Sequence, residues 1–488
     1  MSDHDKARAH QRWAHLRFSI VGPLLAAPPA QGELQAELDR LAAKPWLHPI
    51  TGQPTRFAAS TIQRWYYAAR AEKIDPVGVL RRKVRKDAGQ QPSLNEDLRR
   101  ILQAQYDSHK PWSYQLHFDN LRVLIGEDPR YGPMPSYSSV LRYMKSHALI
   151  RRSLPRGKMT PGLQKAEARL QAREVRSYEA EYVGGLWHLD FHKGPVKILT
   201  PEGEWVTPVL LAILDDHSRL VCHAQWYLSE TAEDLVHGLC QAFLKRGLPR
   251  SLLTDNGSAM IAAETEQGLK RLGIIHATTL PYSPYQNGKQ ESFWGQVDGR
   301  LLAMLDNCPD LKLSFLNGAT QAWIEMEYQR TVHSEIGQSP LKRFLESPSV
   351  SRECPPIDAL RLAFCQEASR TQRRSDGTIS LEGIRFEVPS RFRHLTTITV
   401  RYACWNLAYV HLVDPRTDTV LARLYPLDRT RNAEGLRRSL EEVVDGSASE
   451  PPAEKQEGMA PLLRKLLQEY SATGLPPAYL PKTIKEES

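Results

Sequence analysis

The sequence predicts a multidomain chain, in which an α/β domain follows helical domains and precedes a small β-barrel. Three observations support this fold class. The length of 488 residues allows about three globular units at roughly 150 residues per domain. Strand-like runs alternate with helical runs between residues 184 and 305, which is typical of an α/β domain. Residues 375–425 contain short strand-like runs separated by turn residues, which indicates a small barrel.

Residues 1–90 are predicted to form a helical DNA-binding domain with a helix-turn-helix. Ser60 or Thr61 could cap a helix start. One helical face would carry Ile62, Trp65 and Tyr66 at the spacing i, i+3 and i+4. The remaining surface carries the candidate DNA contacts Gln63, Arg64 and Arg70. The alternative is an ordinary amphipathic helix of a small bundle.

A second helical DNA-binding domain is predicted over residues 91–155. Ser136 could cap a helix whose apolar stripe contains Val140, Leu141 and Met144. The candidate DNA contacts of this domain are Arg142, Lys145, Arg151 and Arg152. A basic linker over 156–180, like the basic run 81–86, could follow DNA phosphates or serve as a solvated tether.

Three acidic residues of the α/β domain lie where a carboxylate needs compensation. Asp190 is inside a strand-like run, Asp255 ends another, and Glu291 opens a helix after a Pro- and Gly-containing loop. A buried carboxylate is costly unless it is paired. Two Mg²⁺ or Mn²⁺ ions, which prefer oxygen ligands, would supply that pairing and could catalyse phosphoryl transfer. Taken singly, each residue also fits a turn, a cap or a helix start.

The sequence motifs around these residues resemble those of the DDE transposases of the retroviral-integrase superfamily. Asp255 and Glu291 are separated by 35 residues. The matching motifs are Trp187–Asp190, Leu214–Arg219, Thr254–Gly257, Pro284–Glu291, Tyr328–His333 and Gln338–Pro340. The resemblance implies an RNase H-like core over 181–345, with a five-stranded mixed sheet and the triad Asp190, Asp255 and Glu291 as metal ligands. It also implies Mg²⁺-dependent cleavage at transposon ends, and transfer of the freed 3′-hydroxyl into target DNA.

Other residues near the triad receive secondary interpretations. Asp215 and Asp216 are predicted to be structural, by capping or by pairing with Arg219. Lys289 is a candidate phosphate contact, and Trp294 is predicted to be a core residue. The family pattern requires none of the nearby histidines, which are left unassigned: His188, His192 and His217.

The β-barrel after the core and the helical domains before it resemble the bacteriophage Mu branch of bacterial transposases. Residues 346–432 would form the β-barrel, and 433–488 a flexible tail with a short amphipathic helix. In this branch the carboxy-terminal end often contacts a target-selecting ATPase. We therefore expect residues 459–482 to bind such a partner, although the helix could instead dock on its own chain.

Composition limits the remaining function classes. The formal net charge of +8 and the pI near 9.0 suit a polyanionic partner. The six cysteines form no CxxC pair, and none precedes residue 222, so DNA recognition is expected to be metal-free. No apolar run reaches membrane-spanning length and no signal peptide is evident. We expect a cytoplasmic, nucleoid-associated bacterial protein that forms a homo-oligomer on DNA. The alternatives are a nuclease that does not join strands and an inactive DNA-binding regulator.

Overall fold

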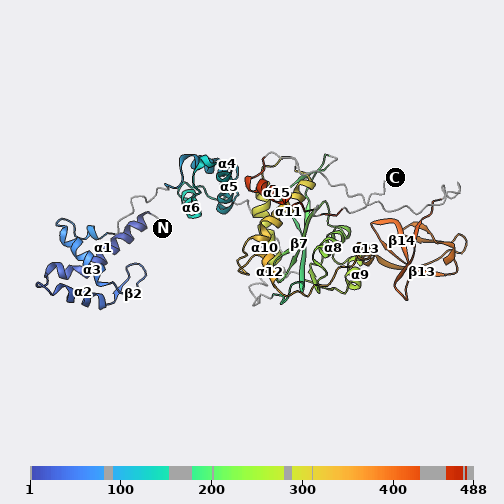
Figure 1. The fold of residues 1–488 in the computed structure, drawn as a ribbon, viewed down its shortest axis with the longest axis horizontal. Helices are drawn as coiled ribbons and strands as arrows, with labels where there is room; N and C mark the ends of the chain where they lie inside the picture. The colour runs from blue at the N-terminus through green and yellow to red at the C-terminus, as the bar shows by residue number, and fades with distance from the viewer. Residues whose placement is uncertain are drawn as a thin grey trace. The chain divides into compact units, whose positions relative to one another are not determined.

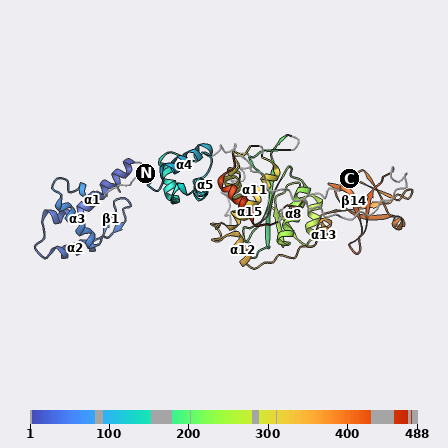
Figure 2. The same cartoon turned by 45° about the horizontal axis from the view of Figure 1, so that its top comes forward.

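The computed structural model describes residues 3–81, 92–152, 179–200, 203–279, 288–309, 311–428, 458–475 and 479–480. The chain divides into two compact units, Met1–Pro92 and Ser93–Ser488, which are described separately. Figures 1 and 2 show their helices and strands. The basic run 82–86 and most of the basic linker, 156–178, lie outside the described residues.

The first unit is a helical domain with a small hairpin. Its elements are α1 (Asp3–Ala26), α2 (Leu34–Ala43), β1 (Trp46–Leu47), β2 (Pro54–Thr55), α3 (Ala59–Ala71) and the 3₁₀ helix η1 (Gly78–Leu80). As predicted, Ile62, Trp65 and Tyr66 of α3 are buried in its core. The predicted cap is wrong, because Ala58 precedes the helix and makes no side-chain cap. The hairpin occupies the connection between α2 and α3, where a helix-turn-helix would have a turn of about 3–4 residues. The helix-turn-helix itself is therefore not confirmed.

The second unit begins with three capped helices. They are α4 (Glu96–Ser108), α5 (Tyr114–Glu127) and α6 (Tyr137–Ser146), with the 3₁₀ helix η2 (Pro129–Tyr131) before α6. Ser136 caps α6, as predicted, by accepting a hydrogen bond from the Ser139 amide. Val140 and Met144 are buried in the core of these helices. Trp112, just before α5, packs in the core of the next domain and donates to the Ala303 carbonyl at 2.7 Å. The three helices are thus attached to that domain.

The central domain contains the expected five-stranded mixed sheet. The strands are β3 (Leu186–Lys193), β6 (Val209–Asp215), β7 (Val221–Tyr227), β8 (Ser251–Thr254) and β9 (Ile275–Thr278), in the order β7-β6-β3-β8-β9. β7, β6 and β3 pair antiparallel, whereas β3, β8 and β9 pair parallel. β4 (Ile198–Leu199) and β5 (Trp205–Val206) pair with each other and form a separate two-stranded sheet.

Helices cover both faces of this sheet (Figure 1). The helical elements of the domain are α8 (Ala232–Arg246), α9 (Ala263–Arg271), α10 (Gly288–Gln296), the π-helical η4 (Val297–Leu302), α11 (Leu313–Met326), η5 (Tyr328–Arg330), α12 (Pro340–Glu346) and α13 (Ile357–Ala363). Successive residues of β6 face opposite sides. Leu210, Ala212 and Leu214 pack with residues of α10 and α11. Leu211 and Ile213 pack with residues of α8. This double burial explains why β6 reads as a continuous apolar run.

The strands after residue 365 form a nearly barrel-like sheet. They are β10 (Gln366–Thr371), β11 (Thr378–Leu381), β12 (Ile384–Glu387), β13 (Thr397–Ala403), β14 (Asn406–Asp414) and β15 (Thr419–Pro426), with the 3₁₀ helix η6 (Ser390–Phe392). Their order is β10-β13-β14-β15-β12-β11, and all pairs are antiparallel. Glu382 and Gly383 join β11 to β12 with φ of 48° and 79°, as a two-residue type I′ turn requires. The strand-rich domain expected here is present.

The tail helix docks on its own chain. α15 (Pro461–Ala472) contacts α11 and α5, and buries Leu462, Leu463 and Leu466 in the core on that side of the sheet. The Leu462 amide donates to Asn120 at 2.9 Å. Docking on its own chain, the alternative that the sequence left open, is therefore present in the structure, and binding of an ATPase by residues 459–482 stays a prediction. No described helix is long and apolar enough to cross a bilayer.

Candidate active site

Asp190 lies in the middle of the sheet, on the face that α10 covers. It pairs across β3 and β6 with Ala212, which packs against that helix. The Trp294 indole donates to Asp190 Oδ2 at 3.3 Å, and the Phe191 amide donates to Oδ1 at 2.8 Å. Trp294 is buried, as predicted, and it also fixes one end of α10 to this carboxylate.

The register of two parallel strands brings Asp255 beside Asp190. Leu186 pairs with Ser251 and His188 with Leu253, so the same register, continued two residues, sets Asp190 opposite Asp255. Asp255 follows the end of β8, and its Oδ1 accepts a hydrogen bond from the Gly257 amide at 2.9 Å. The turn signal and the catalytic interpretation of Asp255 are thus compatible, because its carboxylate takes part in both the turn and the pair.

Burial and like charge act together on this pair. Burial raises the pKa of Asp190 to about 6, and the nearby charge of Asp255 adds to the effect. Hydrogen bonds from Trp294 and Phe191 oppose it, since they favour the ionised form. A divalent cation between the two carboxylates would remove the cost of holding both ionised.

Glu291 lies in the first turn of α10, the helix that Trp294 fixes to Asp190. Its side chain is exposed, although nearby protein atoms desolvate it enough to raise its pKa. Within the described part of the chain, no three His, Cys, Asp or Glu side chains form a group that could hold a metal ion. The structure thus brings Asp190 and Asp255 together but does not close the triad with Glu291. Residues 280–287, before the helix, lie outside the described residues.

Comparison with known families identifies this domain. Residues 180–284 match the family described as Integrase core domain. The chain contains an integrase core. Asp190 and Asp255 lie within the matched residues, and Glu291 lies beyond them.

Known relatives share parts of this integrase-core chain. Over 82 residues it is 37% identical to the Gag-Pro-Pol polyprotein of Human T-cell leukemia virus 3 (strain Pyl43), covering 17% of this chain and 6% of the polyprotein. It is 24% identical over 232 residues to the transposase for transposon Tn552 of Staphylococcus aureus, covering 43% of this chain and 48% of that one. The HTLV-2 integrase catalytic core domain in complex with magnesium matches 33% of this chain and 97% of its own, at 21% identity and a TM-score of 0.27. The chain thus spans less than half the length of these curated relatives.

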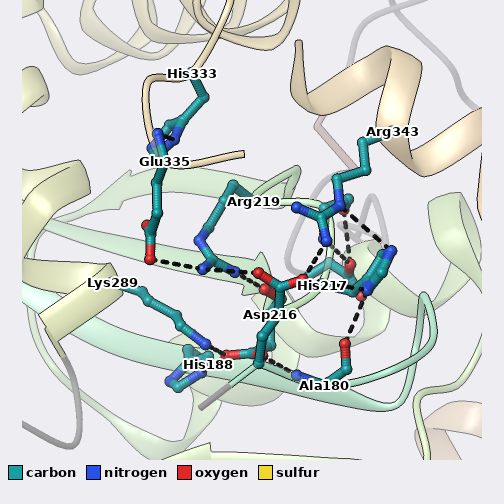
Figure 3. Close-up of polar contacts among 12 residues, drawn as sticks. Ala180, His188, Asp216, His217, Arg219, Lys289, His333, Glu335 and Arg343 are labelled. Atoms are coloured by element: carbon teal, nitrogen blue, oxygen red, sulfur yellow. Dashed lines mark hydrogen bonds and ion pairs between the residues drawn. The ribbon is translucent and has the colours of Figure 1, made fainter. Parts of the chain in front are cut away.

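The integrase core holds one buried cluster that the sequence did not reveal. Lys289, predicted to contact phosphate, forms an ion pair with Asp216 (Figure 3). Asp216 also accepts a hydrogen bond from His188, which had no assigned role. Burial acts to raise the pKa of Asp216, but the bonds from His188 and Lys289 outweigh it and hold the pKa well below its usual range. Arg219 does contact Asp216, as predicted. It donates to the Asp216 backbone carbonyl, however, and not to the carboxylate.

The candidate DNA contacts lie on the helical domains. Side chains of Arg64, Arg70, Arg142, Lys145, Arg151 and Arg152 are exposed, whereas Gln63 is half-buried. Three of them have side-chain contacts within their own domain. Arg70 donates to the Tyr66 hydroxyl, Arg142 to the Ser138 carbonyl and Arg151 to the Pro111 carbonyl. Their role in binding DNA stays a prediction.

The raised pKa of Asp190 predicts a pH dependence of stability without divalent cations. An aspartate in an unfolded chain titrates near 4. The folded state holds the Asp190 proton more tightly than the unfolded state does. The contribution of protonated Asp190 to the stability of the fold is therefore complete below about pH 4 and is lost as pH rises through about 6. In EDTA, Asp190→Asn should therefore be more stable than the unmodified chain at pH 8, by roughly 1–3 kcal/mol, and equal to it near pH 4. Thermal unfolding at both pH values measures this, and an equal difference at the two would contradict it.

Proposed function

We propose that this chain is a DNA transposase that cleaves the ends of a transposon and joins the freed 3′-hydroxyl to target DNA. The observation that carries the proposal is the register of β3 and β8 within the integrase core match: continued by two residues, it would set Asp190 opposite Asp255. The spacing of 35 residues from Asp255 to Glu291 supports it, because it is the spacing of the DDE pattern.

The site is suited to divalent cations. Two neighbouring carboxylates, one with a raised pKa, supply hard oxygen donors and an unfavourable negative charge. Asp190, Asp255 and Glu291 would hold Mg²⁺ or Mn²⁺, two ions per site, with Glu291 brought in by its helix. When bound, such ions stabilise the attacking and leaving oxygens of a phosphoryl displacement. Trp294 keeps Asp190 oriented and helps exclude water from one side of the site.

The flanking domains would hold the DNA. The helical domains bear exposed cations that can neutralise phosphates of transposon-end DNA, and we propose that they recognise it. Joining requires two ends at one target, so the active form would be a homo-oligomer on DNA. The proposed setting is the bacterial cytoplasm, at the nucleoid. Binding of a target-selecting ATPase stays a prediction. In the structure, the apolar face of α15 packs on the chain itself.

A strand-transfer assay tests the proposed function. Oligonucleotides carrying the terminal repeats that flank the gene are incubated with the protein, Mg²⁺ and a supercoiled plasmid. We expect labelled ends joined to plasmid DNA, and no product in EDTA. Cleavage without joining would favour the nuclease alternative, and end binding without either reaction would favour the inactive regulator.

A further inference from the structure

Asp216 lies at the centre of a buried polar cluster in the integrase core (Figure 3). It follows β6 and is 0% exposed. Its carboxylate accepts hydrogen bonds from His188 Nε2 and from the Ala180 amide, both at 2.6 Å, and pairs with the Lys289 ammonium. Burying a carboxylate is costly unless charged and hydrogen-bonding groups surround it. The neighbours of Asp216 supply such groups from three separate parts of the chain.

Two of these neighbours belong to the elements that carry the candidate carboxylates. His188 is two residues before Asp190 on β3, so the two side chains project from the same face of the strand. Lys289 is two residues before Glu291, in the first turn of α10. Asp216 thus contacts both the strand and the helix of the site.

Among the described residues, the Lys289 contact is one of three polar contacts that hold α10 against the sheet and the turn after β6. Gln290 is fully buried and donates to the Ala212 carbonyl at 3.2 Å. Trp294 donates to Asp190 at the other end of the helix. Glu291 lies between these contacts. α10 continues directly into η4, and a helix of this combined length, Gly288–Leu302, is still marginal by itself in water. Tertiary contacts therefore determine where its side chains point.

We propose that Asp216 is a positioning residue for the reaction: through His188 and Lys289 it holds the first turn of α10, and with it Glu291, in place relative to Asp190 on β3. The inference rests on the proposed function and deepens it. Among the described residues, the Asp216 carboxylate contacts the Ala180 amide, His188 and Lys289, so its effect on the reaction is transmitted through the strand and the helix. A misplacement of about 1 Å at a reacting centre can cost on the order of 100-fold in rate.

The first test is the joining rate of the full chain carrying Asp216→Asn. The amide keeps the shape but removes the charge that pairs with Lys289. We expect the rate constant at saturating end DNA to fall about 10- to 100-fold, with the KM for end DNA within about twofold of the unmodified protein. Lys289→Met should give a similar fall, and the double variant should be no slower than either single variant, because the two residues act as a unit.

Asp215→Asn is the matched control. Asp215 is the neighbouring residue and equally buried, but its carboxylate accepts from Gly184 and Ser218 rather than from α10. This variant should lower thermal stability while the joining rate of the folded protein stays within about threefold. A fall as large as that of Asp216→Asn would mean that any change in this turn disturbs the site, and would overturn the specific role of Asp216.

A second readout does not depend on activity. Hydrogen exchange of the α10 amides in the full chain should be faster in Asp216→Asn and in Lys289→Met, and unchanged in Asp215→Asn. Unchanged protection in the first two variants would overturn the inference even if joining were slow. A raised KM with an unchanged rate in Lys289→Met would overturn it as well, because it would make Lys289 a phosphate contact. Failure of the unmodified protein to cleave or join would count against the proposed function, and the exchange data would still decide the positioning role.

Discussion

Asp255→Asn is expected to reduce cleavage and joining by at least about 1,000-fold while leaving end binding nearly unchanged. The substitution keeps the turn, since an amide oxygen can still accept from the Gly257 amide. It removes one of the two negative charges that the strand register sets side by side, and hence most of the attraction for a divalent cation. A 1,000-fold loss corresponds to about 4 kcal/mol of transition-state stabilisation.

The companion variants separate the chemistry from the fold. Asp190→Asn and Glu291→Gln should lose activity to a similar extent, and all three variants should retain end DNA in a gel-shift assay. Ser258→Ala, at an exposed position three residues after Asp255, serves as the control and should join strands at the normal rate. Normal joining by Asp255→Asn would show that the assignment of this site is wrong.

The second large effect concerns the tail helix. Leu463 is 0% exposed, and removing a buried leucine side chain costs roughly 2–5 kcal/mol. Leu463→Ala should therefore weaken the docking of α15 on α11 and α5. Because trypsin cuts after Arg464 or Lys465 only when the helix is released, we expect cleavage there to be about 30-fold faster or more, at roughly 1.4 kcal/mol per tenfold.

An exposed leucine in the same segment provides the control. Leu475 is 63% exposed, and Leu475→Ala should leave cleavage in α15 within about twofold of the unmodified chain. Equal and fast cleavage of all three proteins would mean that the tail is not docked in solution. The apolar face would then be open again to a partner.

The parts of the fold that the sequence predicted are those governed by local pattern. The apolar run of β6, the alternating strands after residue 375 and the capped start of α6 each follow from periodicity or from a side chain that bonds its own backbone. The cap of α3 was wrong because Ser60 and Thr61 fall inside the helix, which begins after Ala58 without any side-chain cap. In that helix, the packing of the apolar face in the core determines where the helix begins.

The interactions that could not be predicted join distant parts of the chain. Nothing local distinguishes a lysine that binds phosphate from one that pairs with a buried aspartate 73 residues away, as Lys289 does. The destination of α15 is equally non-local, because its apolar face fits either its own core or a partner, and only packing decides. The proximity of Asp190 to Asp255 follows from the register of β3 and β8, which the spacing of motifs alone does not give.

The most direct test of the central claim is to map which parts of the backbone surround one metal site. Fe²⁺ replaces Mg²⁺ in the full chain bound to end DNA, and ascorbate with peroxide then generates radicals that cut the backbone near the ion. We expect cuts near residues 190, 255 and 291 together, all suppressed by excess Mg²⁺ and by Asp255→Asn. Cuts near 190 and 255 but not near 291, or cuts indifferent to Asp255→Asn, would contradict a single active site built from Asp190, Asp255 and Glu291.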